Sequence, residues 1–425
     1  MNPTKLFKLF IVLAVTSFIS VSTARSQESL DVLHDFGGVG DGSRPFSGLI
    51  SDSGGNLYGT TFMGGPANAG TVYMLSPTGG GWKERVLHSF SGQLDGAAPF
   101  DSVVMDSDGN LYGTTQHGGA YNQGTVFKLA PASDGGWNFS VLYTFRGRND
   151  GGAPQSSLVL DAKGNLYGTT ITGGVPGRNS CLNGCGVSFR LSPSPASAWT
   201  ETVLHSFSGG ADGSGPNGPL VFDRDGNLYG TAAQGGDKTY CYHLGCGVVY
   251  ELSPSSDGEW KQKVIHTFTN RKDGDTPNGT LTLDPLGNLF GVANGGSDGF
   301  CTDGCGIVFE LARSSGGMWK EIVIHRFNGS DGEGPAMGLT LDSSGNVYGA
   351  AVGGGPGSGG LLFELSQDDG GNWTETNLHS FLGGNIYGSG PNGRLLMDSD
   401  GDLFGTTGSG GLQGSDGGTA FKFIP

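Results

Sequence analysis

Short apolar runs separated by turn residues follow one another along almost the whole chain. Residues 99–145 contain four of them, at 99–106, 110–115, 124–130 and 137–145. Each run is rich in β-branched and aromatic residues, and Gly, Asp, Asn or Pro stands between the runs. No segment of comparable length shows the 3.6-residue period of a helix. The pattern predicts an all-β unit of four short antiparallel strands.

This unit recurs seven times. Its clearest marker is Asp-x-x-Gly-Asn-Leu-Tyr-Gly, and successive copies are 54 to 62 residues apart. The copies and their close variants begin at Asp52, Asp106, Asp161, Asp223, Asp284, Asp342 and Asp398. Four short strands repeated radially are typical of a β-propeller blade. We therefore expect a seven-bladed β-propeller.

The two ends of the chain supply the parts of one blade. Residues 30–36 have the sequence of a fourth strand without a blade, and residues 418–424 have that of a third strand with no fourth strand after it. Pairing them would close the ring and remove two unpaired sheet edges. A linear solenoid, the alternative, would need polar caps at both ends. Closure of the ring by the N-terminal strand is the favoured interpretation.

The amino-acid sequence of the repeat also resembles that of a known family. His-x-Phe, Asp-Gly-x-x-Pro, Gly-Asn-Leu-Tyr-Gly-Thr-Thr and Gly-Thr-Val-Phe-x-Leu are similar to the GloVer tandem repeat of exported bacterial proteins, over roughly residues 30–425. The resemblance implies an exported protein built from these repeats. It brings no established activity and no catalytic residues to carry over.

The first 24 residues differ from the rest. Lys5 and Lys8 precede an apolar run from Leu9 to Val21, and residues 22–24 are small, as at a signal-peptide cleavage site. An uncleaved anchor is the weaker alternative, because the run is short for a bilayer. We expect a signal peptide at 1–24, a single propeller domain at 25–425, no membrane span in the mature chain, and a secreted, periplasmic or cell-envelope location.

Charge and motifs exclude several classes of function. The formal net charge is −16, which disfavours binding to phosphate backbones, so nucleic acid is not an expected partner. The chain has no phosphate-binding loop. Carboxylate pairs occur in every repeat, so no unique acid/base pair stands out. We expect no catalytic residues, no cofactor and no metal.

Residues that recur once per repeat are expected to build the repeat. Asp-x-Asp-Gly-Asn, as at Asp106, resembles the start of a calcium loop, but a strand follows at once and a hairpin turn is favoured. A packing role is expected for His34, His88, His205, His266, His325 and His379, with Tyr143 at the seventh position. Packing between blades is expected for Trp82, Trp137, Trp199, Trp260, Trp319 and Trp373, each six residues earlier. This even offset places Trp and His on one face of an unbulged strand.

The cysteines are absent from most repeats. They form three close pairs in the loops between strands two and three of blades three, four and five: Cys181 and Cys185, Cys241 and Cys246, and Cys301 and Cys305. In an exported protein such pairs predict disulfides within each loop. Bridges between neighbouring loops and a thiolate metal or redox site remain as alternatives.

These loops are also where we expect a ligand. They vary most among the repeats, and loops on a rigid scaffold commonly carry binding. The expected contacts are Arg178, Tyr240, Tyr242, His243 and Phe300. The favoured function is a binding or scaffolding module for an extracellular glycan, peptide or protein. The alternatives are a propeller-type polysaccharide hydrolase or lyase and a purely structural envelope protein.

Overall fold

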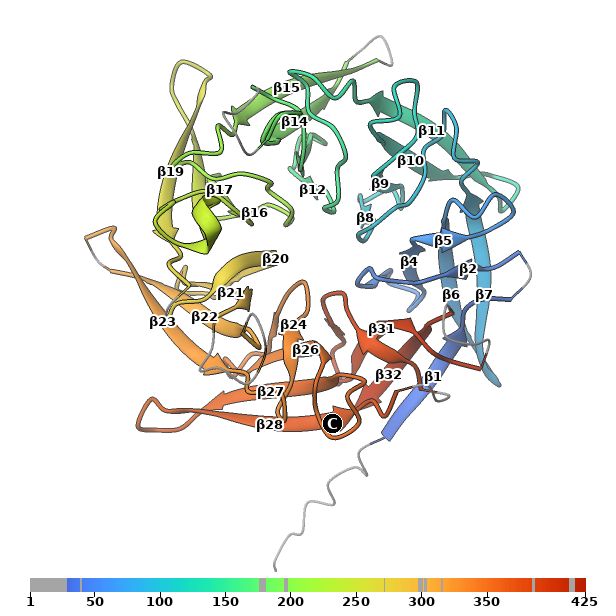
Figure 1. Cartoon of the computed structure of the whole chain (residues 1–425). Coiled ribbons are helices and arrows are strands. Elements are labelled where there is room, and N and C mark those ends of the chain that lie inside the picture. The colour runs from blue at the N-terminus through green and yellow to red at the C-terminus, as the bar shows by residue number, and fades with distance from the viewer. Residues whose placement is uncertain are drawn as a thin grey trace, which may run out of the picture.

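The computed structural model describes residues 29–425 except 39, 176–180, 195–197, 271, 297–300, 302–303, 315, 384–386 and 413–416. Over these residues the chain is all-β apart from one 3-10 turn, η1 (Cys241–His243). Seven antiparallel sheets surround a central axis, which confirms the predicted seven-bladed propeller (Figure 1). We find no helix in the described part with the length and apolarity needed for a membrane crossing. The predicted signal peptide lies outside the described residues.

Each blade runs from its innermost strand outward in chain order. Blades 1 to 3 are β3 (Ile50–Ser51), β4 (Leu57–Thr61), β6 (Thr71–Thr78), β7 (Gly81–Ser89); β8 (Val104–Met105), β9 (Leu111–Thr115), β10 (Thr125–Pro131), β11 (Trp137–Thr144); and β12 (Val159–Leu160), β13 (Leu166–Thr170), β14 (Val187–Pro193), β15 (Trp199–Ser206). Blades 4 and 5 are β16 (Val221–Phe222), β17 (Leu228–Ala232), β18 (Val248–Pro254), β19 (Trp260–Thr267); and β20 (Asp275–Leu283), β21 (Leu289–Gly295), β22 (Ile307–Arg313), β23 (Trp319–Arg326). Blade 6 is β24 (Glu333–Pro335), β25 (Thr340–Leu341), β26 (Val347–Gly353), β27 (Leu361–Gln367), β28 (Trp373–Ser380). The small ladder of β2 (Gly42–Ser43) and β5 (Met63–Gly64) lies beside blade 1.

Blade 7 is assembled from both ends of the chain. It contains β29 (Ser389–Pro391), β30 (Leu396–Met397), β31 (Leu403–Ser409) and β32 (Thr419–Ile424), and its outer strand is β1 (Ser29–Asp35). β1 pairs antiparallel with β32, from Ser29 opposite Ile424 to Asp35 opposite Thr419. Figure 1 shows the blue N-terminal strand beside the red C-terminal one. The predicted closure is confirmed.

The glycine of the repeated Leu-Tyr-Gly makes room for a ring from the neighbouring strand of the same blade. In blade 2 a Cβ atom on Gly113 would lie 2.5 Å from the ring of Phe127 on the next strand. Phe127 has no exposed surface. Only glycine leaves room for this ring, because any larger residue would clash in a tightly packed interior.

The tryptophans pack between blades, as predicted. Trp137 of blade 2 contacts the ring of Tyr58 in blade 1, with ring centroids 6.2 Å apart. The other five lie against Phe404, Tyr112, Tyr167, Tyr229 and Phe290, each on the preceding blade. The seams between blades are therefore aromatic on the outer side.

The expectation that Trp and His share one face of their strand is wrong. In β7 the register shifts between Val86 and His88, because one extra residue forms a β-bulge. Trp82 consequently contacts Phe404 of blade 7, whereas His88 stacks on Phe139 of blade 2, with centroids 3.8 Å apart. The bulge lets one outer strand present a ring to each of its two neighbours.

Candidate functional site

The crossovers between blades and the loops between second and third strands lie together, on what we call the crossover face. The backbone N–H of Gly215, in the crossover to blade 4, donates to the carbonyl of Cys185, at 2.8 Å. Gly334, in the crossover to blade 6, donates in the same way to Cys305, at 2.9 Å. The cysteine loops are therefore held by the crossovers, as the order of strands predicts.

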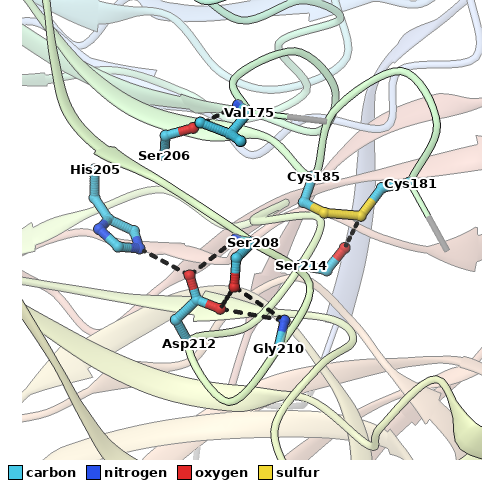
Figure 2. The surroundings of a disulfide bond; sticks show 9 residues. All are labelled: Val175, Cys181, Cys185, His205, Ser206, Ser208, Gly210, Asp212 and Ser214. Carbon is cyan, nitrogen blue, oxygen red and sulfur yellow. Dashed lines mark hydrogen bonds and ion pairs between the residues drawn. A yellow bond between two sulfur atoms is a disulfide. The ribbon is translucent and has the colours of Figure 1, made fainter. Parts of the chain in front are cut away.

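All six cysteines form disulfides within their own loops. The pairs are Cys181–Cys185, Cys241–Cys246 and Cys301–Cys305, with Cα–Cα distances of 5.1, 5.3 and 5.2 Å. Figure 2 shows the first of them, with the Ser214 hydroxyl 3.7 Å from the sulfur of Cys181. This confirms the local pairing, and it leaves no thiolate for a metal or for a bridge between loops.

The oxidised protein is expected to contain no free thiol, and its mass after alkylation should increase by six alkyl groups only when it is reduced first. Replacing Cys241 and Cys246 by Ser should lower the free energy of unfolding by roughly 2 kcal/mol, because a short loop is no longer closed in the unfolded chain. Denaturant titration of the oxidised protein and the variant measures this. Equal stability, or peptides cross-linked between loops, would contradict the assignment.

A pocket opens on the crossover face beside the Cys181–Cys185 loop. Its volume is about 530 Å³, and no charged side chain lines it among the residues that the structure describes. The polar lining consists of Gln155, Asn183, Asn217, Gln234, Ser214 and Thr172. We call this the amide pocket. Four carboxamides from four different segments converge here, and each offers both donors and an acceptor.

The carboxamides that line this pocket make few hydrogen bonds to described residues of the protein. The Asn217 Nδ2 donates to Oδ1 of Asn278 at 2.9 Å, but Asn217 Oδ1 is buried and has no partner in the described part of the chain. The side chains of Gln155, Asn183 and Gln234 likewise make no hydrogen bond to any residue that the structure describes. Gln155 is half-buried and Asn183 and Gln234 are exposed, so Asn217 Oδ1 is the buried atom of this set without a partner. Such an atom is uncommon in native proteins and calls for a partner such as water or a ligand.

Three of the predicted ligand contacts can be located. Tyr242 is 91% exposed, and η1 holds it at the tip of the blade-four loop with a φ of 54°. Cys241 and His243 also have positive φ, so the turn has a conformation that side chains rarely adopt. Tyr240 is half-buried and packs against the core cluster that contains Cys246. Arg178 and Phe300 lie outside the described residues, as do parts of their loops.

Sequence reasoning missed the amides because they occupy repeat positions. Gln155 and Asn217 immediately follow the prolines of the crossovers. The corresponding residues elsewhere are Phe46, Phe100, Asn278, Ala336 and Asn392. This position varies among the repeats while the preceding proline does not, and this variation was the available signal in the sequence.

An aromatic cluster lies on the same face in blades 1 and 2. The rings of Phe46, Phe62 and Phe100 have centroids 5.8 to 6.0 Å apart and are all half-buried. Gly408 of blade 7 makes room for them, because a Cβ atom there would lie 2.5 Å from Phe46. The crossover face is therefore apolar at blades 1 and 2 and amide-rich at blades 3 and 4.

The opposite face carries the hairpins that resemble calcium loops. In blade 2, Oδ1 of Asp106 accepts from the backbone N–H of Asp108 and Asn110, and Oδ2 accepts from the Asn110 side chain and the Tyr112 hydroxyl. Burial alone would raise the pKa of Asp106, but these hydrogen bonds together lower it. The carboxylate is thus engaged in its own turn, as the hairpin interpretation predicts.

Polar side chains also meet at the junctions between neighbouring blades, and we call these groups seam clusters. Between blades 7 and 1, His34 Nε2 lies 3.0 Å from Asp41 Oδ2, and a carboxylate oxygen of Glu84 lies within 4.8 Å of both atoms. Three other seams bring together Tyr143, Asp150 and Glu201; His266, Asp273 and Glu321; and His325, Asp331 and Glu375.

The seam clusters support the packing role predicted for the histidines. His34, Asp41 and Glu84 carry donor types that Zn²⁺ accepts. Tyr143, however, donates to Asp150 at 3.0 Å in the same position. A seam with a phenol in place of the imidazole keeps the same hydrogen bond, so we interpret these groups as structural.

The glutamates of the seams were missed by sequence reasoning. Glu84, Glu201, Glu321 and Glu375 each have a buried Oε1 without a hydrogen-bond partner among the described residues. Burial, and then the charge of the neighbouring Asp, raises the pKa of each to about 7. Each stands two residues after a repeat Trp, and this Trp-x-Glu pattern was visible in the sequence.

Comparison with known proteins supports the repeat assignment. The family model described as the Gloeobacter/Verrucomicrobia repeat matches residues 19–198 and 135–314, which together make up more than half of the chain. No curated protein matches the sequence.

Solved structures resemble the fold at low sequence identity. Two crystal structures of the extracellular domain of BT4673 from B. thetaiotaomicron match with TM-scores of 0.55 and 0.52, at 13% and 12% identity. They align with 94% and 92% of this chain, but the chain spans only 42% and 41% of those domains. A luciferin-regenerating enzyme matches with a TM-score of 0.42 at 15% identity, over 76% of this chain and 90% of its own. Likeness at these identities concerns the fold alone.

Proposed function

The chain belongs to the Gloeobacter/Verrucomicrobia repeat family, and we propose that it is an exported propeller that binds a neutral glycan in the amide pocket. The apolar leader at 1–24, the three disulfides and the fold shared with extracellular domains support export. The chain then works as a binding module outside the cytoplasm, with residues 25–425 as one domain.

The observation that carries the proposal is the lining of the pocket, in which the described side chains are uncharged and the amides keep hydrogen-bonding groups that the protein does not use. Sugar hydroxyls donate and accept, and carboxamides do both as well. A volume of about 530 Å³ lies in the range of small-ligand sites. A peptide or protein partner would ordinarily meet larger apolar or charged groups at the centre of its site.

Replacing Gln155 and Gln234 by Ala should weaken glycan binding at least tenfold. Each substitution removes hydrogen-bonding groups from the pocket and no side-chain hydrogen bond that the structure describes within the protein. A glycan array with the oxidised protein identifies a ligand, and calorimetry with that glycan measures the loss. Gln93→Ala is the matched control, since Gln93 is exposed in the crossover to blade 2.

Three further outcomes discriminate among the alternatives. Unchanged affinity in the double variant would exclude the amide pocket. Loss of binding in Tyr242→Ala alone would place the ligand on the blade-four loop, and this variant should fold normally because Tyr242 is 91% exposed. Release of shortened saccharides during incubation would favour the hydrolase or lyase instead.

A further inference from the structure

An axial channel runs between the inner strands of all seven blades. It holds a cavity of about 450 Å³. The residue three positions after each crossover proline belongs to one layer near this channel: Gly48, Ser102, Ser157, Pro219, Thr280, Gly338 and Arg394. Six of the seven are small, and Arg394 is the single charged residue of the layer. All of them except Gly338 line the cavity.

The two neighbours of Arg394 in this layer are glycines, and both are needed for its placement. A Cβ atom on Gly48 would lie 2.7 Å from the carbonyl oxygen of Arg394. One on Gly338 would lie 3.2 Å from the Cβ of Arg394 and 3.4 Å from that of Thr280. The glycines of blades 6 and 1 thus leave space around the side chain of Arg394. Thr280 of blade 5 lies next to Gly338, on the side away from Arg394.

The guanidinium of Arg394 makes no polar contact within the described part of the chain. No described residue forms an ion pair or side-chain hydrogen bond with it. Surrounding protein lowers the pKa of Arg394 by excluding bulk water, and no carboxylate counteracts this effect. The side chain nevertheless retains solvent-accessible surface, because it borders the channel.

The one carboxylate that lines the cavity is already engaged. Asp101 accepts hydrogen bonds from the backbone N–H groups of Ser102 and Ser157, at 2.7 and 2.8 Å. Arg394 is exposed to the solvent of the channel, and its guanidinium keeps five N–H donors that no described residue uses, so it is available to an anion.

We propose that the axial channel binds an oxyanion, the carboxylate, sulfate or phosphate group of a small ligand, on Arg394. The planar guanidinium presents two parallel N–H groups, the geometry that suits two oxygens of such a group. The Thr280 hydroxyl, beside Gly338, supplies a further donor. This site is separate from the amide pocket and does not rest on the glycan proposal.

Calorimetry with the oxidised protein at low ionic strength tests the site with inorganic phosphate, sulfate and glucuronate, and with glucose as the neutral comparison. At least one anion should bind with one ligand per chain. Arg394→Gln should weaken that binding at least tenfold, and Arg394→Lys should weaken it less, because the charge stays while the fork is lost. Arg224→Gln is the matched control, since Arg224 is exposed on a hairpin of the opposite face.

The three anions separate the sources of the oxyanion. Preference for glucuronate indicates an acidic sugar, and preference for phosphate or sulfate indicates an inorganic or ester group. Equal affinity of Arg394→Gln and the unsubstituted protein for the anion would overturn the proposal. Failure of the unsubstituted protein to bind any of the three anions at about 10 mM would overturn it as well. If Arg394→Gln shows no cooperative transition in thermal unfolding, Thr280→Val replaces it as the test variant. Thr280→Val should weaken anion binding severalfold. Binding of a neutral glycan that depends on Gln155 is unaffected by any of these results.

Discussion

Deleting residues 29–36 is expected to abolish cooperative unfolding and to cause aggregation. The deletion removes β1, the outer strand of blade 7, and leaves the edge of β32 unpaired, which is a template for association with other chains. It also removes Phe36, which has no exposed surface and packs on Tyr73 of blade 1 with ring centroids 4.8 Å apart. Size-exclusion chromatography and thermal unfolding by circular dichroism measure the result.

Point substitutions in the same strand provide graded controls. Leu33 is 8% exposed within the core cluster of blades 7 and 1, so Leu33→Ala should lower the free energy of unfolding by about 2–5 kcal/mol. Val32 is 37% exposed, and Val32→Ala should cost about 1 kcal/mol or less. A truncated protein that remains monomeric and unfolds in one sharp transition at the original temperature would show that closure does not depend on β1.

Converting the seam glutamates to glutamine is expected to stabilise the protein at pH 8 and to leave it unchanged near pH 4.5. The variant carries Glu84→Gln, Glu201→Gln, Glu321→Gln and Glu375→Gln. Burial and the adjacent aspartates raise the pKa of these carboxyls to about 7 in the folded protein, from 4.5. The folded state therefore binds these four protons more tightly than the unfolded chain.

The direction of the pH effect follows from that difference. Between pH 4.5 and about 7 the unfolded chain releases the protons first, so the free energy of unfolding falls as the pH rises and levels off above 7. Glutamine resembles the protonated acid and carries no such penalty. Each carboxyl is only half-buried, so water screens its charge and about 1 kcal/mol or less per site is expected.

Thermal unfolding of both proteins at pH 4.5 and pH 8 measures the effect. For a domain of this size the midpoint at pH 8 should rise by about 3 °C. Glu259→Gln, in an exposed turn, is the control and should change neither midpoint. A gain of the same size at both pH values, or no gain at pH 8, would show that folding does not raise the pKa of the seam carboxyls.

The fold was predictable because each structural requirement recurs seven times. The fixed turn at Asp106 and the buried glycine at Gly113 reflect local chemistry that a sequence displays directly. The missing strand of blade 7 was visible at residues 30–36 for the same reason. The bulge in β7 was not visible, since the inserted residue has no special side chain and its effect appears only in which neighbour His88 touches.

The candidate sites were less predictable, because they depend on contacts between repeats. Gln155, Asn217 and Gln234 are ordinary residues at ordinary positions, and only the radial arrangement brings them to one pocket. Arg394 is similarly unremarkable in the sequence until the six small residues of its layer are placed around the same channel. The exposed Tyr242, by contrast, was indicated by the irregular loop that carries it.

The pairing of β1 with β32 also sets the order in which the molecule can be completed. Asp35 Oδ2 accepts a hydrogen bond from the N–H of Leu412, 377 residues later. During synthesis β1 therefore remains without its pairing partner until β32 has been made. The other six blades form from contiguous segments and can be complete by then. If the protein is exported unfolded, ring closure is the slowest contact to find, and a chaperone that shields the waiting strand would raise the yield.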